Sequence, residues 1–116
     1  IRELAIFSPE HSQSLMPMLN RIVDTEIPFK ENWYLHPSLM GRSSIKVVLP
    51  TLVPELSYEA MAIADGLSAA FGFEDMYEGV VVGDAARVVR ENLLDYCRMD
   101  TLAMARIVET LRGLLR

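Results

Sequence analysis

The sequence predicts a mainly α-helical fold with at most one or two short strands. Apolar residues recur at helical spacing from Val88 to Leu114, and no segment outside 79–83 has the character of a strand. With 51% hydrophobic and 23% charged residues, the composition is that of a folded globular chain. Because 116 residues suffice for one core and not for two, we expect residues 1–116 to form one domain or one part of a domain.

The first third is predicted to hold one helix followed by an aromatic loop. Ser8-Pro9 is typical of a helix start, because serine accepts free amide hydrogens and proline is pre-set for the first helical position. The apolar stripe of this helix is Leu15, Met18, Leu19, Ile22 and Val23. Pro17 is expected to kink it. Residues 24–37 are turn-rich, and their aromatic side chains are expected to pack and not to stack on bases. These aromatic residues are Phe29, Trp33 and Tyr34.

The middle of the chain is predicted to form short elements. Residues 41–44 resemble a turn and helix cap, which opens a short helix through Leu49. Pro50 and Pro54 should confine that helix, because proline lacks the amide donor that a helix interior needs. Ser57 is expected to cap a short turn over residues 58–63.

The last half holds the clearest helices. Asp65-Gly66 predicts the start of a helix of about three turns. Residues 79–83 form either a short strand or an apolar linker. Asp84 is expected to cap the C-terminal helical segment, which fits one long helix or two in series. The apolar stripe there is Val88, Leu93, Tyr96, Cys97, Asp100, Met104, Ile107, Leu111 and Leu114.

Charge and composition exclude several classes of function. The net charge of −5 disfavours a module that grips nucleic acid over its whole surface, because such modules need clustered basic residues. The single cysteine excludes an internal disulfide, and two distant histidines argue against a zinc site; Cys97 should be a small core residue. No apolar stretch approaches a membrane span, so we expect no membrane partner and a cytoplasmic location. The chain opens on Ile1 without an initiator methionine, and we expect it to be a piece of a longer protein.

Asp100 is the one charged residue on the apolar stripe of the last helix. A buried carboxylate without a partner costs several kcal/mol, so a partner or a metal ion should neutralise it. Tyr96 lies four residues earlier on the same helical face, which places a phenol beside this carboxylate. Spacing alone also fits a surface hydrogen bond or a helix cap.

A resemblance to a known family covers most of the chain. Residues 93–104 resemble the third exonuclease motif of the DEDD superfamily in its tyrosine-containing form. More specifically, the chain resembles an uncharacterised bacterial domain family with a ribonuclease-H-like exonuclease fold. The matching segments, in the family's order and approximate spacing, are 36–37, 41–50, 56–58, 65–66 and 96–101. The resemblance implies that this chain is the helical C-terminal part of an α/β ribonuclease-H-like domain.

The same resemblance implies a metal-dependent 3′–5′ exonuclease acting on DNA or RNA. In such enzymes four carboxylates hold two Mg²⁺ or Mn²⁺ ions at the scissile phosphate. Asp100 would be the fourth carboxylate and a metal ligand, and Tyr96 would hydrogen-bond the attacking water. The first two motifs are absent from this chain, and one carboxylate cannot hold two ions. We therefore expect the chain to be inactive alone and the full-length protein to supply the other ligands.

Residues 41–46 offer a second candidate site. The side chains of Arg42, Ser43, Ser44 and Lys46 have the chemistry to meet a nucleic-acid phosphate at a helix start. The alternative is that Ser43 or Ser44 caps the helix while Lys46 is solvated.

A rival function from another class is a non-catalytic helical protein-interaction module. Helices that normally cover a sheet would expose a large apolar face in this chain alone. Under either hypothesis we expect the chain to self-associate through that face.

Overall fold

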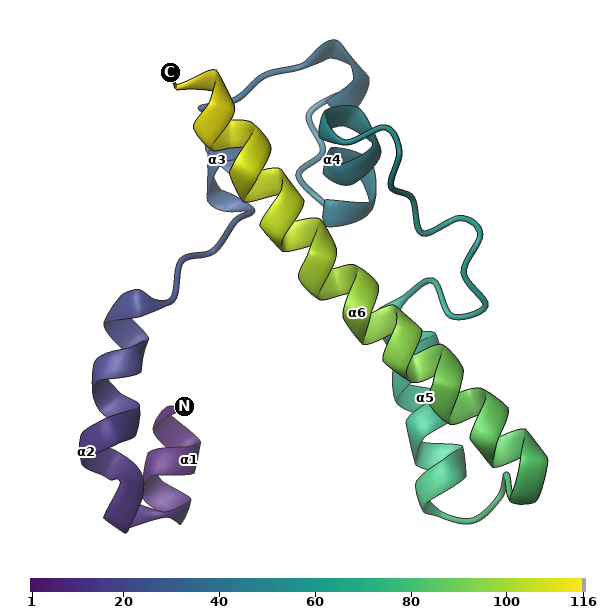
Figure 1. Cartoon of the computed structure of the whole chain (residues 1–116). Helices are drawn as coiled ribbons and strands as arrows, with labels where there is room; N and C mark the ends of the chain where they lie inside the picture. Colours follow the sequence, from purple (N-terminus) through teal and green to yellow (C-terminus); the bar gives the residue numbers. More distant parts are fainter. Residues whose placement is uncertain (116) are drawn as a thin grey trace.

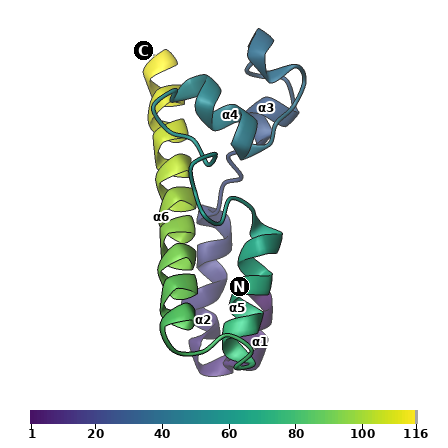
Figure 2. The ribbon, with the colours of Figure 1, turned by 90° about the vertical axis from the view of Figure 1, so that its right-hand side faces the viewer.

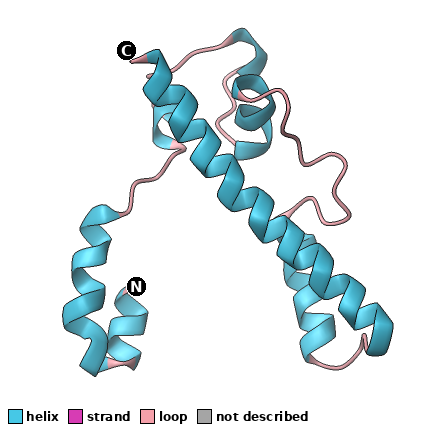
Figure 3. Ribbon diagram, viewed as in Figure 1, coloured by secondary structure: helices cyan, strands magenta, loops and turns pink. Residues whose placement is uncertain are grey.

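The computed structural model describes residues 1–115, and these residues form helices joined by turns and loops. The elements are α1 (Arg2–Phe7), η1 (Pro9–His11), α2 (Ser12–Leu15), η2 (Met16–Arg21), α3 (Ile27–Lys30), η3 (Pro37–Leu39), α4 (Ile45–Leu52), α5 (Gly66–Tyr77) and α6 (Gly83–Leu114), where η denotes a 3-10 helix. No strand occurs among them (Figure 3). The predicted mainly α fold is confirmed. No helix in this part of the chain is both long and apolar enough to cross a membrane.

Helix α6 is the spine of the structure, and both α4 and α5 pack along it (Figure 1). Its 32 residues extend for about 48 Å, so the last third is one helix and not two. Its N-cap is Val82, and Asp84 lies inside the first turn, so the predicted capping role of Asp84 is wrong. A carboxylate in the first turn still interacts favourably with the helix dipole.

The segment between α5 and α6 is a helix ending and not a strand. Gly79 adopts φ +74°, and the amide of Val80 donates to the carbonyl of Asp75 at 2.9 Å. The amide of Gly79 donates to the carbonyl of Met76 at 3.3 Å, which completes a Schellman motif. Val80 is therefore part of the C-terminal cap of α5 and not of a strand. The start of α5 is as predicted, since Asp65 accepts a hydrogen bond from the amide of Ser68.

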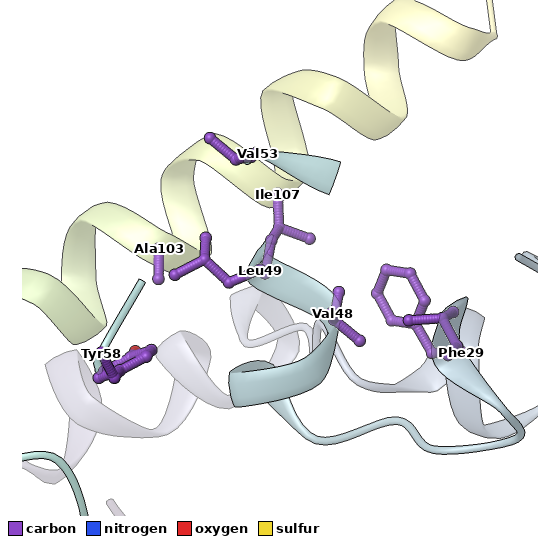
Figure 4. Close-up of a cluster of buried hydrophobic side chains, with 8 residues drawn as sticks. Phe29, Val48, Leu49, Val53, Tyr58, Ala103 and Ile107 are labelled. Atoms are coloured by element: carbon purple, nitrogen blue, oxygen red, sulfur yellow. The ribbon is translucent and has the colours of Figure 1, made fainter. Parts of the chain in front are cut away.

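The core lies where α4 crosses α6 (Figure 4). Its buried residues are Phe29, Leu39, Val48, Leu49, Val53, Tyr58, Ala103 and Ile107. Ala103 is fully buried, and its small side chain lets α4 approach α6 closely. Pro50 does not end α4, contrary to the prediction, because it lies inside the helix on the exposed side. It removes only one amide donor, and the helix ends two residues later at Leu52.

Residues 1–21 form a separate helical arm, here called the N-terminal arm. Its α1 packs on α2, and an extended segment leads from η2 to α3 (Figure 2). The arm therefore stands away from α4–α6 (Figure 1). Ser8 and Pro9 are the N-cap and first residue of η1, so a helix starts where predicted. The Ser8 side chain makes no capping hydrogen bond, because its hydroxyl donates to the carboxylate of Glu10 instead. Pro17 is accommodated at the start of the 3-10 helix η2 and not at a kink in an α-helix.

The described chain is more open than a folded domain of its mass. Its accessible surface is 8802 Å², whereas a compact monomer of 13.1 kDa exposes about 6400 Å². Its radius of gyration is 17.6 Å, against about 13 Å for a compact chain of this length. Large apolar side chains are exposed along its helices, among them Leu67, Phe71 and Phe73 of α5. Cys97 is also exposed, so the expectation of a core cysteine is wrong. Helices α4 and α5 cover only one side of α6. Part of the apolar stripe of α6, including Cys97, therefore remains exposed.

Candidate functional site

Three side chains meet where the loop after α4 passes over the middle of α6. The hydroxyl of Tyr58 donates a hydrogen bond to Oδ1 of Asp100 at 2.7 Å. Tyr96 lies one turn before Asp100 on α6, and the rings of Tyr58 and Tyr96 are 6.3 Å apart between centroids. The two predicted catalytic residues, Tyr96 and Asp100, therefore share one site with a third residue. We call these residues the Tyr58–Asp100 cluster.

Tyr58 is the residue that fixes this cluster to the core. Its side chain is buried, with 5% of its surface exposed, and belongs to the hydrophobic core. An ion pair between Arg106 of α6 and Glu55, at 2.7 Å, ties the loop before Tyr58 to the same helix. Burial, and then the hydrogen bond to Asp100, raise the pKa of Tyr58 well above its usual range. The phenol therefore remains a hydrogen-bond donor to the carboxylate at neutral pH.

Asp100 is half-buried and has the partner that the sequence analysis required. That partner is Tyr58, which sequence reasoning missed. The two residues are 42 positions apart, and no local spacing links them. The available signal was that Tyr58 is an aromatic residue with a polar end, a side chain that usually finds a hydrogen-bond partner when it is buried.

Tyr96 is half-buried and extends toward the start of α5. A Cβ built on Gly66 would lie 3.8 Å from its hydroxyl oxygen, so the phenol passes close to this helix N-terminus. Burial raises the pKa of Tyr96, and the negative charge of Asp100 raises it further. Asp65, the N-cap of α5, raises it as well, so a second carboxylate faces the same phenol.

Asp65 connects the cluster to one residue of the second predicted site. Its two carboxylate oxygens accept from the amide and the hydroxyl of Ser68 at 2.9 and 2.8 Å. These hydrogen bonds lower the pKa of Asp65, and the positive charge of Lys46 lowers it further. Lys46 lies in the first turn of α4. Its charge and the Tyr96 phenol therefore both interact with the carboxylate of Asp65.

The other residues of the second predicted site lie against acidic side chains. The hydroxyl of Ser43 donates to Glu26 at 2.6 Å. Ser43 and Ser44 line a cleft of about 360 Å³ that Asp24 and Glu26 also line. Ser44 is the N-cap of α4, although its side chain makes no capping hydrogen bond. Nε of Arg42 donates to the carbonyl of Leu39 at 3.5 Å. Two carboxylates in this cleft would repel a phosphate, whereas the charge of Lys46 acts on Asp65. Contact of these residues with a nucleic-acid phosphate stays a prediction.

A divalent metal ion does not fit the residues of this chain alone. Mg²⁺ and Mn²⁺ prefer several oxygen ligands in octahedral geometry. Among residues 1–115 there is no group of three or more acidic, histidine or cysteine side chains that could hold an ion. One oxygen of Asp100 is already taken by Tyr58. Any metal ion bound at Asp100 would need further ligands besides this carboxylate.

Comparison with known proteins relates the start of the chain to one family. The family model described as Domain of unknown function (DUF2779) matches residues 1–44, which comprise the N-terminal arm, α3 and η3. No curated protein matches the chain, and no solved structure matches it. The Tyr58–Asp100 cluster lies outside the matched segment.

Proposed function

We propose that this chain is the helical segment of a metal-dependent 3′–5′ exonuclease and contributes Asp100 and Tyr96 to an active site completed by other parts of the full-length protein. The observation that carries the proposal is the fixed position of Asp100. A half-buried carboxylate is held in one orientation by a buried tyrosine, with a second tyrosine beside it. Perturbed titratable groups gathered in this way are typical of functional sites.

Each residue of the cluster has a distinct part in the proposal. Tyr58 holds Oδ1 of Asp100, so Oδ2 is the oxygen that the carboxylate presents to a further partner. Tyr96 supplies a neutral phenol at the same point, kept protonated by burial and by Asp100. Lys46 adds a positive charge near the start of α5, where it would attract a phosphate backbone.

The test is degradation of end-labelled single-stranded DNA and RNA by the full-length protein with Mg²⁺ or Mn²⁺. Asp100→Asn should reduce degradation by about 100-fold or more, because an amide is a much poorer metal ligand than a carboxylate. Asp95→Asn is the matched control, since Asp95 is an exposed acid on the same helix. Equal rates for the two variants would refute the proposed role of Asp100. Absence of degradation by the unaltered full-length protein would refute the exonuclease.

A second function, a non-catalytic protein-interaction module, is favoured by a different observation. The described chain exposes about 2400 Å² more surface than a compact monomer of its mass. Helix α5 has no buried residue and exposes Leu67, Phe71 and Phe73. Large apolar side chains exposed together on one helix are typical of a face that binds another protein surface. Under this proposal Asp100→Asn affects only stability, and a charged substitution on α5, such as Phe71→Glu, abolishes partner binding.

A further inference from the structure

We propose that two copies of this chain exchange their N-terminal arms, with the tip of each arm docking in the apolar groove between α3 and the C-terminal end of α6 of the other copy. This inference requires neither of the functions proposed above. It concerns two surfaces that the Tyr58–Asp100 cluster does not use.

The N-terminal arm cannot be stable by itself. Ala5 is its only buried residue, and 21 residues are too few to build a core. Its α1 ends in the most exposed part of the arm, where Ile6 is 79% and Phe7 is 89% exposed. Phenylalanine is among the side chains whose burial contributes most to the stability of a core or an interface. The tip of the arm therefore requires an apolar receptor.

The groove between α3 and the end of α6, here called the α3–α6 groove, is such a receptor. It has a volume of about 300 Å³ and is lined mainly by apolar side chains, including Val23, Pro28, Trp33, Leu111 and Leu115. Trp33 lies at this groove with 75% of its surface exposed. An exposed tryptophan beside an open apolar groove is typical of a docking site for another apolar side chain.

The arm of the same chain points away from this groove. Residues 9–21 form consecutive helical turns about 20 Å long, and the groove begins at Val23, two residues beyond the end of the arm. The turn between α1 and η1 is the end of the arm farthest from α3 (Figure 1). Phe7 would reach its own groove only if the arm folded back on itself. The arm of a second copy meets no such obstacle.

Surface area and charge both fit a second copy. The excess surface of about 2400 Å² per chain exceeds the roughly 800 Å² that each partner buries in a standard stable interface. The arm has two basic residues, Arg2 and Arg21, and two acidic residues, Glu3 and Glu10, so the net charge of −5 resides in the remainder of the chain. The lining of the groove includes one acid and one base, Asp24 and Arg112, so a neutral arm would meet a neutral groove without charge repulsion. Two arms and two grooves close a symmetric dimer.

The first experiment measures the mass of the whole chain by light scattering across micromolar concentrations. We expect a dimer, and we expect Phe7→Glu to weaken it by about tenfold or more. Leu94→Glu is the control, because Leu94 is an exposed apolar residue on α6 that does not line the groove. Circular dichroism would verify that both variants keep their helices. A monomeric chain, or equal weakening by the two substitutions, would overturn the proposal.

The second experiment locates the contact by disulfide formation in a Cys97→Ser background. One chain carries Glu10→Cys near the arm tip, and the other carries Arg112→Cys at the groove. We expect a mixed disulfide between them. In the control pair the second chain carries Asp84→Cys, about 42 Å from residue 112 along α6. Equal cross-linking in the two pairs would refute arm exchange. A chain with both Glu10→Cys and Arg112→Cys that closes an internal disulfide, and forms no dimer, would refute it as well.

Discussion

The hydroxyl of Tyr58 and Oδ1 of Asp100 are joined by a 2.7 Å hydrogen bond that links the loop after α4 to the middle of α6. The bond combines a buried donor with a half-buried charged acceptor. Hydrogen bonds to charged groups contribute more to stability than bonds between neutral groups. The same contact therefore orients the carboxylate and stabilises the fold.

Removal of the Tyr58 hydroxyl should destabilise the chain without leaving a cavity in the core. Tyr58→Phe keeps the ring but leaves Oδ1 of Asp100 without its donor, and we expect the free energy of unfolding to fall by about 1–2 kcal/mol. Urea denaturation at neutral pH measures this change. Tyr34→Phe is the control, because Tyr34 packs its ring against Phe29 and its hydroxyl makes no hydrogen bond with the residues that the structure describes. A loss of equal size in the control would contradict the assignment.

Alkaline pH should remove the stability that the hydrogen bond between Tyr58 and Asp100 contributes. The pKa of Tyr58 and that of Tyr96 are both raised in the folded state. Stability from a raised pKa is fully present below the pKa of the unfolded residue, about 10 for tyrosine, and is lost as pH rises through the folded value. We expect the melting temperature to fall above about pH 10. Tyr58→Phe should show a shallower fall, and parallel curves for the two proteins would count against this linkage.

The contrast between Tyr96 and Tyr58 shows what the sequence could reveal about this site. Helical periodicity placed Asp100 on the inner face of its helix and made Tyr96 its neighbour, because residues four apart share a face. The need for a partner followed from the cost of a buried charge. The identity of that partner depended on a loop that crosses α6 from a distant part of the chain. Only tertiary packing brings Tyr58 there.

The fold was predictable where the signals were local. The cap at Asp65 and the apolar stripe of α6 are encoded in neighbouring residues, and both helices begin within a few residues of their predicted starts. The helices α1 and α3 were missed, since neither has a side-chain capping bond and each is too short to show a period. Val80 was ambiguous because a β-branched apolar residue fits a strand and a Schellman motif equally well.

Helix α4 carries the two most completely buried large side chains, Val48 and Leu49. Leu49 has no exposed surface, so Leu49→Ala would leave a cavity beside Ala103 and Ile107. We expect a loss of about 2–5 kcal/mol in the free energy of unfolding. Leu67→Ala is the matched control, because Leu67 is 65% exposed on α5, and it should change stability by less than about 1 kcal/mol. Similar losses for both leucines would mean that the α4–α6 contact is not the core.

Asp65 caps the N-terminus of α5. Asp65→Ala should lower the melting temperature at neutral pH, because the amide and hydroxyl of Ser68 lose their acceptor. The pKa of Asp65 is lowered in the folded state, so its contribution is present above the usual aspartate pKa of about 4 and is lost as pH falls further. The variant and the parent chain should therefore converge at acidic pH. Asp75→Ala, in the C-terminal half of the same helix, removes a carboxylate that the helix dipole disfavours there and should not lower the melting temperature. A gap between Asp65→Ala and the parent that stays constant from neutral to acidic pH would show that the carboxylate does not cap α5.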